Sequence, residues 1–226
     1  MTGIEPAGLV AVLAWGIVAS LDLVSGPQLL LSRPLVAGTM AGLLLGDPLA
    51  GLTVGAVLEL FALEVVPIGA IRYPDFSLAA VIGTVVATGR PLPLVLGMGV
   101  GLGLVVAEGS RGLMDVVRRR NASAAQAEAA ALAAGDAGVV ARLQHAGLGR
   151  DAMRASLLLV TGLAGAVLLR RLGTPPAGLG VALTSIAVAG GAAAALNGAV
   201  RTISQGGRWP WLAVGGAGGV LLLVLR

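Results

Sequence analysis

The strongest constraint on this chain is an apolar stretch, residues 34–60, that is threaded with glycines and interrupted by two acids. The glycines recur every four or five residues, at Gly38, Gly42, Gly46, Gly51 and Gly55. A spacing of four places small residues on one face of a helix, and such a face packs closely against another helix in a bilayer. The first acid, at position 47, precedes a proline, which is typical of a helix N-cap followed by proline at the first helical position.

The second acid, Glu59, is the strongest candidate for a functional residue. It follows Gly51 and Gly55 at intervals of four and therefore lies roughly in line with the glycine face. A carboxylate within an apolar segment is costly in lipid and by default indicates a functional site. It can accept hydrogen bonds from sugar hydroxyls when ionised, or donate one when protonated. The structural alternative is a carboxylate bonded to helix backbone or to a partner helix.

The composition indicates an integral membrane protein. Of the 226 residues, 57% are hydrophobic and 12% charged, whereas soluble domains average about a quarter charged residues. Few arginines are present and they lie beside apolar segments, so a nucleic-acid partner is not expected. We predict an all-α polytopic membrane protein with about six to eight apolar helical segments, some of them short, broken or re-entrant. These segments cover residues 7–24, 34–46, 48–66, 78–88, 92–108, 153–169, 177–199 and about 209–225.

The distribution of charge divides the chain into three regions. Residues 1–108 form an N-terminal membrane region, residues 109–152 a polar loop rich in alanine and arginine, and residues 153–226 a C-terminal membrane region. The loop is expected to hold one or two exposed helices. Three consecutive arginines, 118–120, favour a cytoplasmic location for it, although arginines 170 and 171 leave the topology open.

Three further positions carry polar chemistry. Asp22 and Gln28 form an acid and amide pair near a break after the first apolar segment, where they either bind a polyol or mark the membrane interface. Asp75 follows Pro74 and either forms a loop ion pair or contacts a substrate. The single histidine, His145, lacks an acidic neighbour and reads as a solvated loop residue. We predict no catalytic residue, no metal ligand and no cofactor site.

Several of these elements together resemble one family of membrane proteins. The motifs are Arg-Pro-Leu-Val-Ala-Gly at 33–38, Leu-Leu-Leu-Gly-Asp at 43–47, Gly-Ala-Val-Leu-Glu-Leu at 55–60, Val-Pro-Ile-Gly at 66–69 and Pro-Asp at 74–75. Their order and spacing resemble those of the sugar-translocating IIC subunit of the mannose/fructose/sorbose family of the bacterial phosphotransferase system, over roughly residues 20–90.

The resemblance implies a multi-pass protein of the bacterial inner membrane that pairs with a IID membrane subunit in a larger oligomer. Soluble IIA and IIB components would carry the phosphoryl groups on their own histidines. The IIC subunit would hold a hexose-like sugar for phosphorylation by IIB. By this resemblance Glu59, Asp22 and Asp75 correspond to the acids of the family motifs, and we assign Gln28 to the same sugar site.

Two other functions stay open at this stage. The chain departs from the family pattern in its shorter length, in Glu64 after the acid motif, and in Arg72 and Tyr73. These departures also fit a regulatory or scaffold subunit that has lost transport. A facilitator that releases unmodified sugar is the third possibility, and the sequence does not identify the sugar.

Overall fold

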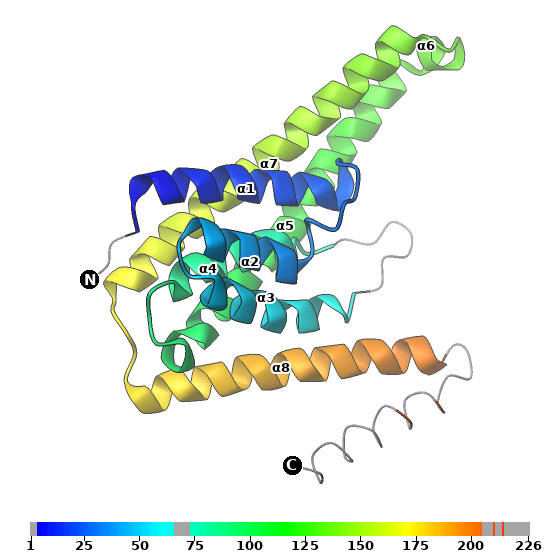
Figure 1. Ribbon diagram of the computed structural model, residues 1–226. Coiled ribbons are helices and arrows are strands. Elements are labelled where there is room, and N and C mark those ends of the chain that lie inside the picture. Colours follow the sequence, from blue (N-terminus) through cyan, green and yellow to red (C-terminus); the bar gives the residue numbers. More distant parts are fainter. Residues whose placement is uncertain (1–3, 66–72, 205–209, 211–213, 215–226) are drawn as a thin grey trace.

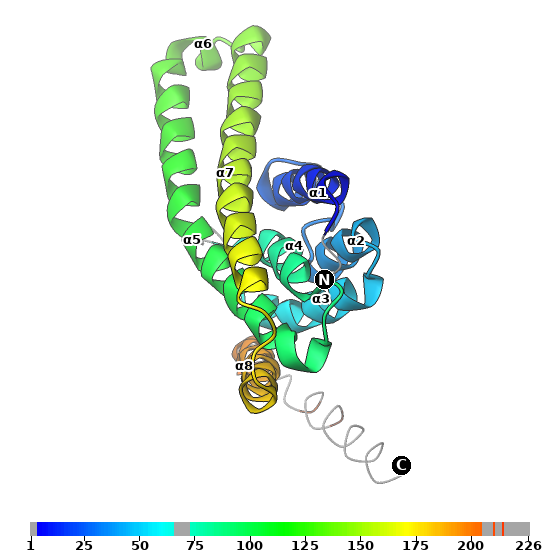
Figure 2. The ribbon, with the colours of Figure 1, turned by 90° about the vertical axis from the view of Figure 1, so that its left-hand side faces the viewer.

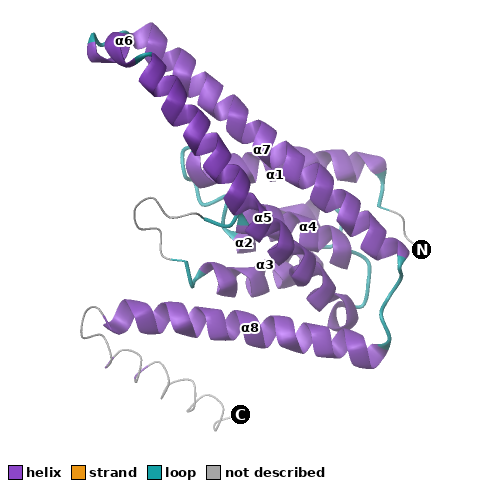
Figure 3. Ribbon diagram, turned by 180° about the vertical axis from the view of Figure 1, so that it is seen from behind, coloured by secondary structure: helices purple, strands orange, loops and turns teal. Residues whose placement is uncertain are grey.

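The computed structural model describes residues 4–65 and 73–204, together with positions 210 and 214 (Figure 1). Every regular element in these residues is a helix (Figure 3). The helices are α1 (Pro6–Val24), α2 (Pro34–Leu44), α3 (Pro48–Ala62), α4 (Phe76–Ala87), α5 (Leu92–Ala127), α6 (Ala129–Ala133), α7 (Ala137–Arg171) and α8 (Ala177–Ser204). Helices α1, α5, α7 and α8 are long and apolar enough to cross a membrane, whereas α2, α3 and α4 are shorter. The predicted all-α polytopic architecture is confirmed.

Prolines set several of the helix starts. Pro6, Pro34 and Pro48 each occupy the first position of a helix, where the missing N–H has no intrahelical partner to lose. Asp47 caps α3 by accepting a hydrogen bond from the backbone N–H of Ala50, at 3.1 Å. The predicted N-cap is therefore confirmed.

The glycine face joins α2 to α3. A Cβ atom built on Gly51 would lie 2.1 Å from the carbonyl oxygen of Gly38, and one on Gly42 would lie 3.0 Å from the Cα of Gly51. A Cβ on Gly55 would meet the carbonyl oxygen of Pro34 at 2.6 Å. The backbones of α2 and α3 are in contact at these positions, which is possible only because glycine has no side chain. The close helix packing predicted from the glycine spacing is confirmed.

Helix α4 forms the centre of the bundle. Every residue from Ser77 to Ala87 is buried, and helices α1, α2, α3, α5 and α7 all pack against it. Glycines again allow the approach to α5, where a Cβ on Gly99 would lie 2.7 Å from the carbonyl oxygen of Gly83. The short helices α2, α3 and α4 therefore form an inner group, with α1 and α8 on opposite sides of it (Figures 1 and 2).

Helices α5 and α7 run side by side far beyond this group, and α6 lies at the tip of the hairpin they form (Figure 2). Residues 109–152 are thus mostly helical, and their helices continue from the apolar segments without interruption through positions 108–109 and 152–153. Alanine and arginine favour helix, so the helices continue where the apolar sequence ends. The division into three regions stays a prediction. The predicted last apolar segment, about 209–225, lies almost wholly outside the described residues.

Candidate functional site

The connection between α1 and α2 carries the first predicted site residues. We call residues 25–35 the clasp segment; it includes the first two residues of α2. Asp22, at the end of α1 and 3% exposed, accepts hydrogen bonds from the backbone N–H groups of Leu29 at 2.6 Å and Ser32 at 3.2 Å. Gln28 is exposed and has a φ of 57°, and Leu30 has a φ of 66°. Such left-handed residues persist where the surroundings hold them, and the Asp22 carboxylate supplies that restraint.

Glu59 holds the other end of the clasp segment. Its Oε1 atom lies 2.8 Å from Nη2 of Arg33, and its Oε2 atom accepts a hydrogen bond of 3.2 Å from the backbone N–H of Leu35. The side chain of Glu59 is 17% exposed and that of Arg33 is 47% exposed, so the ion pair is open to a ligand. The glycine contacts between α2 and α3 bring the end of α3 to the start of α2 and so place Glu59 there.

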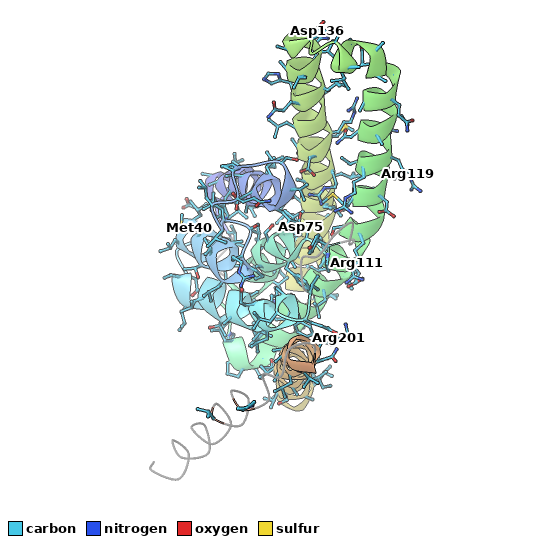
Figure 4. All side chains as sticks on the ribbon, turned by 90° about the vertical axis from the view of Figure 1, so that its right-hand side faces the viewer. Met40, Asp75, Arg111, Arg119, Asp136 and Arg201 are labelled. Carbon is cyan, nitrogen blue, oxygen red and sulfur yellow. The ribbon has the colours of Figure 1, made fainter. Side chains whose placement is uncertain are left out.

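Asp75 lies elsewhere, in a buried ion pair. It is fully buried, and its Oδ2 atom lies 3.1 Å from Nη2 of Arg154 on α7. Hydroxyl groups of Ser20 and Ser77 each donate to the same carboxylate at 2.5 Å. Figure 4 shows Asp75 inside the bundle, whereas Arg119 points outward from α5. The carboxylate also caps α4 by accepting from the N–H of Leu78, so its oxygens are occupied by the protein itself.

The network continues from Arg154 to the clasp segment. Nε of Arg154 donates to Oδ1 of Asp151 at 2.7 Å, and the hydroxyl of Ser25 donates to Oδ2 of the same aspartate at 2.7 Å. Arg154 and Asp151 are 3% and 2% exposed. Nη1 of Arg154 is buried and has no hydrogen-bond partner among the described residues.

The clasp segment also borders a pocket of about 300 Å³ between the end of α1 and the α5/α7 hairpin. Its polar lining comes from Ser25, Asn121, Gln144 and Arg150. Nη1 of Arg150 donates to Oδ1 of Asn121 at 2.8 Å, which orients both side chains. The volume is at the lower end of the range for small-molecule sites, and hydroxyl, amide and guanidinium groups suit a polar, hydroxylated ligand.

A larger cavity, of about 670 Å³, lies where α1 begins and α2 and α7 end, beside the turn after α4. Asp47 and Arg170 contribute charges to its lining, and Oδ2 of Asp47 accepts from the N–H of Gly89 at 2.8 Å. Nearby, Arg90 donates to the carbonyl of Gly173, and burial lowers the pKa of its guanidinium. None of the four predicted site residues lines this cavity.

Of the four predicted residues, Asp22 and Glu59 each bond to the clasp segment and Gln28 is part of it. Asp75 is linked to the segment through the Arg154 network. Two residues of that network, Asp151 and Arg154, were missed by sequence reasoning. Their signal is a pair of opposite charges three residues apart at the start of an apolar run. Charged residues within an apolar segment usually face the interior of the helix bundle and pair with polar groups of other helices.

Glu64 and His145, both noted in the sequence, lie outside this network. Glu64 accepts a hydrogen bond of 2.7 Å from the side-chain amide of Asn197, so both residues link α8 to the end of α3. His145 is exposed, and its Nδ1 lies 2.8 Å from the carbonyl oxygen of Ala141. Within the described residues no group of three potential metal ligands occurs.

Comparison with known proteins decides the family. The model of the family described as the sorbose-specific IIC component of the phosphotransferase system (EII-Sor) matches residues 7–215. The chain belongs to this family. Membership confirms the resemblance found in the sequence motifs, and with the four long apolar helices it identifies a multi-pass protein of the bacterial inner membrane.

Curated relatives of this IIC chain match over a short region. The sorbose-specific EIIC component of Lacticaseibacillus casei is 49% identical over 53 residues, which are 24% of this chain and 19% of the relative. The mannose-specific EIIC component of Escherichia coli K12 is 45% identical over 53 residues, 24% of this chain and 20% of the relative. The fructose permease IIC component of Bacillus subtilis is 47% identical over an equally long segment. The matched part thus spans about a fifth of each relative's length.

Solved structures share the fold over nearly the whole IIC chain. One, described only as a membrane protein, superimposes with a TM-score of 0.75 at 24% identity and covers 99% of this chain and 96% of the other. The cryo-EM structure of the mannose transporter ManYZ in complex with microcin E492 has a TM-score of 0.62 at 23% identity, with the same coverages. At these identities the likeness shows the fold.

Proposed function

We propose that this IIC chain is the sugar-translocating subunit of a mannose-type phosphotransferase system. It binds a hexose-like sugar at the clasp segment, carries it inward and presents it for phosphorylation by a IIB partner. The observation that carries this proposal is the partly exposed Glu59–Arg33 ion pair at the clasp segment, which also contains Gln28 and is bonded by Asp22, in a chain whose family model describes a phosphotransferase IIC component.

The chemistry of the clasp segment fits a polyol. A carboxylate accepts hydrogen bonds from hydroxyl groups and a guanidinium donates them, so adjacent hydroxyls of a sugar can bond to Glu59 and Arg33 together. The amide of Gln28 both donates and accepts. Asp22 is buried against the backbone of the segment and holds its shape, and it contacts the sugar only if those bonds open.

Asp75 has a different role in this proposal. Its full burial and its four protein partners leave no free carboxylate oxygen for a sugar in this conformation. We assign it to anchoring α1, α4 and α7 together behind the clasp segment.

The implied partners follow from the same proposal. A IID membrane subunit completes the transporter in a larger oligomer, and soluble IIA and IIB components supply the phosphoryl group. In this scheme the phosphoryl group stays on histidines of the soluble components, and the exposed His145 has no assigned role.

The test is uptake of labelled hexoses by cells that lack their own mannose-type system. The chain is expressed with the IIA, IIB and IID proteins encoded near it, and the intracellular product is analysed for phosphate. Phosphorylated sugar that depends on this chain supports the proposal. Free sugar inside the cells would instead indicate a facilitator. Absence of uptake across a broad panel of sugars, with the assembled complex present in the membrane, would indicate a regulatory subunit.

A further inference from the structure

The buried pair Asp151 and Arg154 occupies one face of α7, at the level where α1 ends. Inside the bundle Arg154 donates hydrogen bonds to Ser20, Asp75 and Asp151. One carboxylate oxygen of Asp151 accepts from Arg154, and the other accepts from the hydroxyl of Ser25. This bond is the link between the buried network and the clasp segment.

We propose that Asp151 and Arg154 are positioning residues for the sugar site, acting through Ser25. The inference rests on the proposed function, because it deepens the account of the same site. Arg154 orients the Asp151 carboxylate, and Asp151 then fixes the first residue of the clasp segment. The segment in turn carries Gln28 and holds Arg33 against Glu59.

The position of Ser25 separates this role from simple core stability. Ser25 is exposed, so its side chain fills no space in the core, although its hydroxyl donates to the buried Asp151 carboxylate. A buried ion pair is weak support for stability, because well-packed apolar residues often replace it without loss. The bond from the Ser25 hydroxyl to Asp151 joins residues 126 positions apart in the sequence, and it fixes the start of the clasp segment against α7.

The geometry of the clasp segment also requires an outside restraint. Its backbone holds two non-glycine residues, Gln28 and Leu30, in the left-handed region. Strained residues of this kind persist only where neighbouring contacts over-determine them. Asp22 restrains the middle of the segment and Glu59 restrains its end. Ser25 restrains the start of the segment, and it also lines the pocket between the end of α1 and the α5/α7 hairpin, so its movement changes that pocket too.

The first experiment measures sugar uptake as a function of concentration, in cells expressing the complete system. Ser25→Ala should raise the half-saturation concentration about three- to tenfold, the effect of losing one hydrogen bond, while the maximum rate per assembled complex is kept. Ser25→Thr keeps the hydroxyl and should restore the wild-type value. The matched control is Ser156→Ala, whose hydroxyl donates, among the residues that the structure describes, to the carbonyl of Ala152 on its own helix.

Asp151→Asn should also raise the half-saturation concentration. Combined with Ser25→Ala, it should raise the half-saturation concentration by less than the product of the two single effects, because both changes act on the Ser25–Asp151 bond. A wild-type half-saturation concentration in Ser25→Ala would overturn the proposal. So would a loss confined to the maximum rate and to the amount of assembled protein, since that pattern is the mark of a structural role.

A second measurement does not depend on transport. The chain has no cysteine, so Ser32→Cys places a single thiol in the half-buried part of the clasp segment. In permeabilised membranes containing the complex, its labelling rate with a small water-soluble thiol reagent should rise about three- to tenfold when Ser25→Ala is added, and stay unchanged with Ser156→Ala. Equal rates in all three proteins would overturn the positioning role. Absence of uptake by wild type, and of protection of this thiol by any sugar, would instead count against the proposed function.

Discussion

Gly51→Ala should destabilise the protein, because it places a methyl group into the closest helix contact of the described structure. The new Cβ would lie 2.1 Å from the carbonyl oxygen of Gly38 and 2.9 Å from the Cα of Gly42, far inside an ordinary contact of about 3.5 Å. Both neighbours are backbone atoms, so relief requires α2 and α3 to separate by roughly 1 Å. Overpacking typically costs about 1–3 kcal/mol, and a contact with backbone on two sides belongs at the upper end.

The assay is thermal unfolding of the detergent-solubilised complex, followed by size-exclusion chromatography. For a chain of this size a loss of about 3 kcal/mol corresponds to a fall in Tm of about 6–12 °C. The matched control is Gly101→Ala on α5, where a Cβ would meet nothing within 4 Å and helix propensity improves. Separation of the helices would also stretch the Glu59–Arg33 pair, so uptake should fall. A Gly51→Ala protein as stable as Gly101→Ala would refute the packing argument.

Two further substitutions test the buried and capping carboxylates. Arg154→Met leaves two buried acids, Asp75 and Asp151, without their cation, and should cost about 3–5 kcal/mol in thermal unfolding. Adding Asp75→Asn and Asp151→Asn should recover much of that stability, and no recovery would contradict a charge-based loss. Asp47→Ala removes the cap of α3 and the bond to the N–H of Gly89, and should cost about 1–2 kcal/mol. An unchanged Tm in that variant would show that the cap contributes nothing measurable.

The local features of the fold could be predicted from the sequence because their signals are local. Glycines at intervals of four identify a close-packing face and prolines mark helix starts, so two short helices with such a face were predicted over residues 34–60, although not that they pack against each other. The full lengths of α5 and α7 could not be predicted in this way. Polarity shows where an apolar segment ends, whereas these helices continue into polar sequence.

The site was predictable only in part, for a related reason. Asp22 and Glu59 stand out as acids within apolar segments, and the structure places both at the clasp segment. The ion pair of Asp75 joins residues 79 positions apart, and no periodicity connects them. The left-handed backbone of Gln28 and Leu30 could not be predicted from the sequence either, since neither position carries the glycine or asparagine that usually indicates this conformation.

The most direct test of the account is a comparison of Glu59→Gln with Glu64→Gln in the complete transport system. The two acids lie at the end of the same helical region, five positions apart. Glu59 faces Arg33 and the clasp segment, whereas Glu64 faces Asn197 on α8. The account predicts that Glu59→Gln abolishes or strongly reduces accumulation of phosphorylated sugar at normal levels of assembled protein, and that Glu64→Gln retains it. Uptake at the wild-type rate by Glu59→Gln would remove Glu59 from the sugar site and contradict the account.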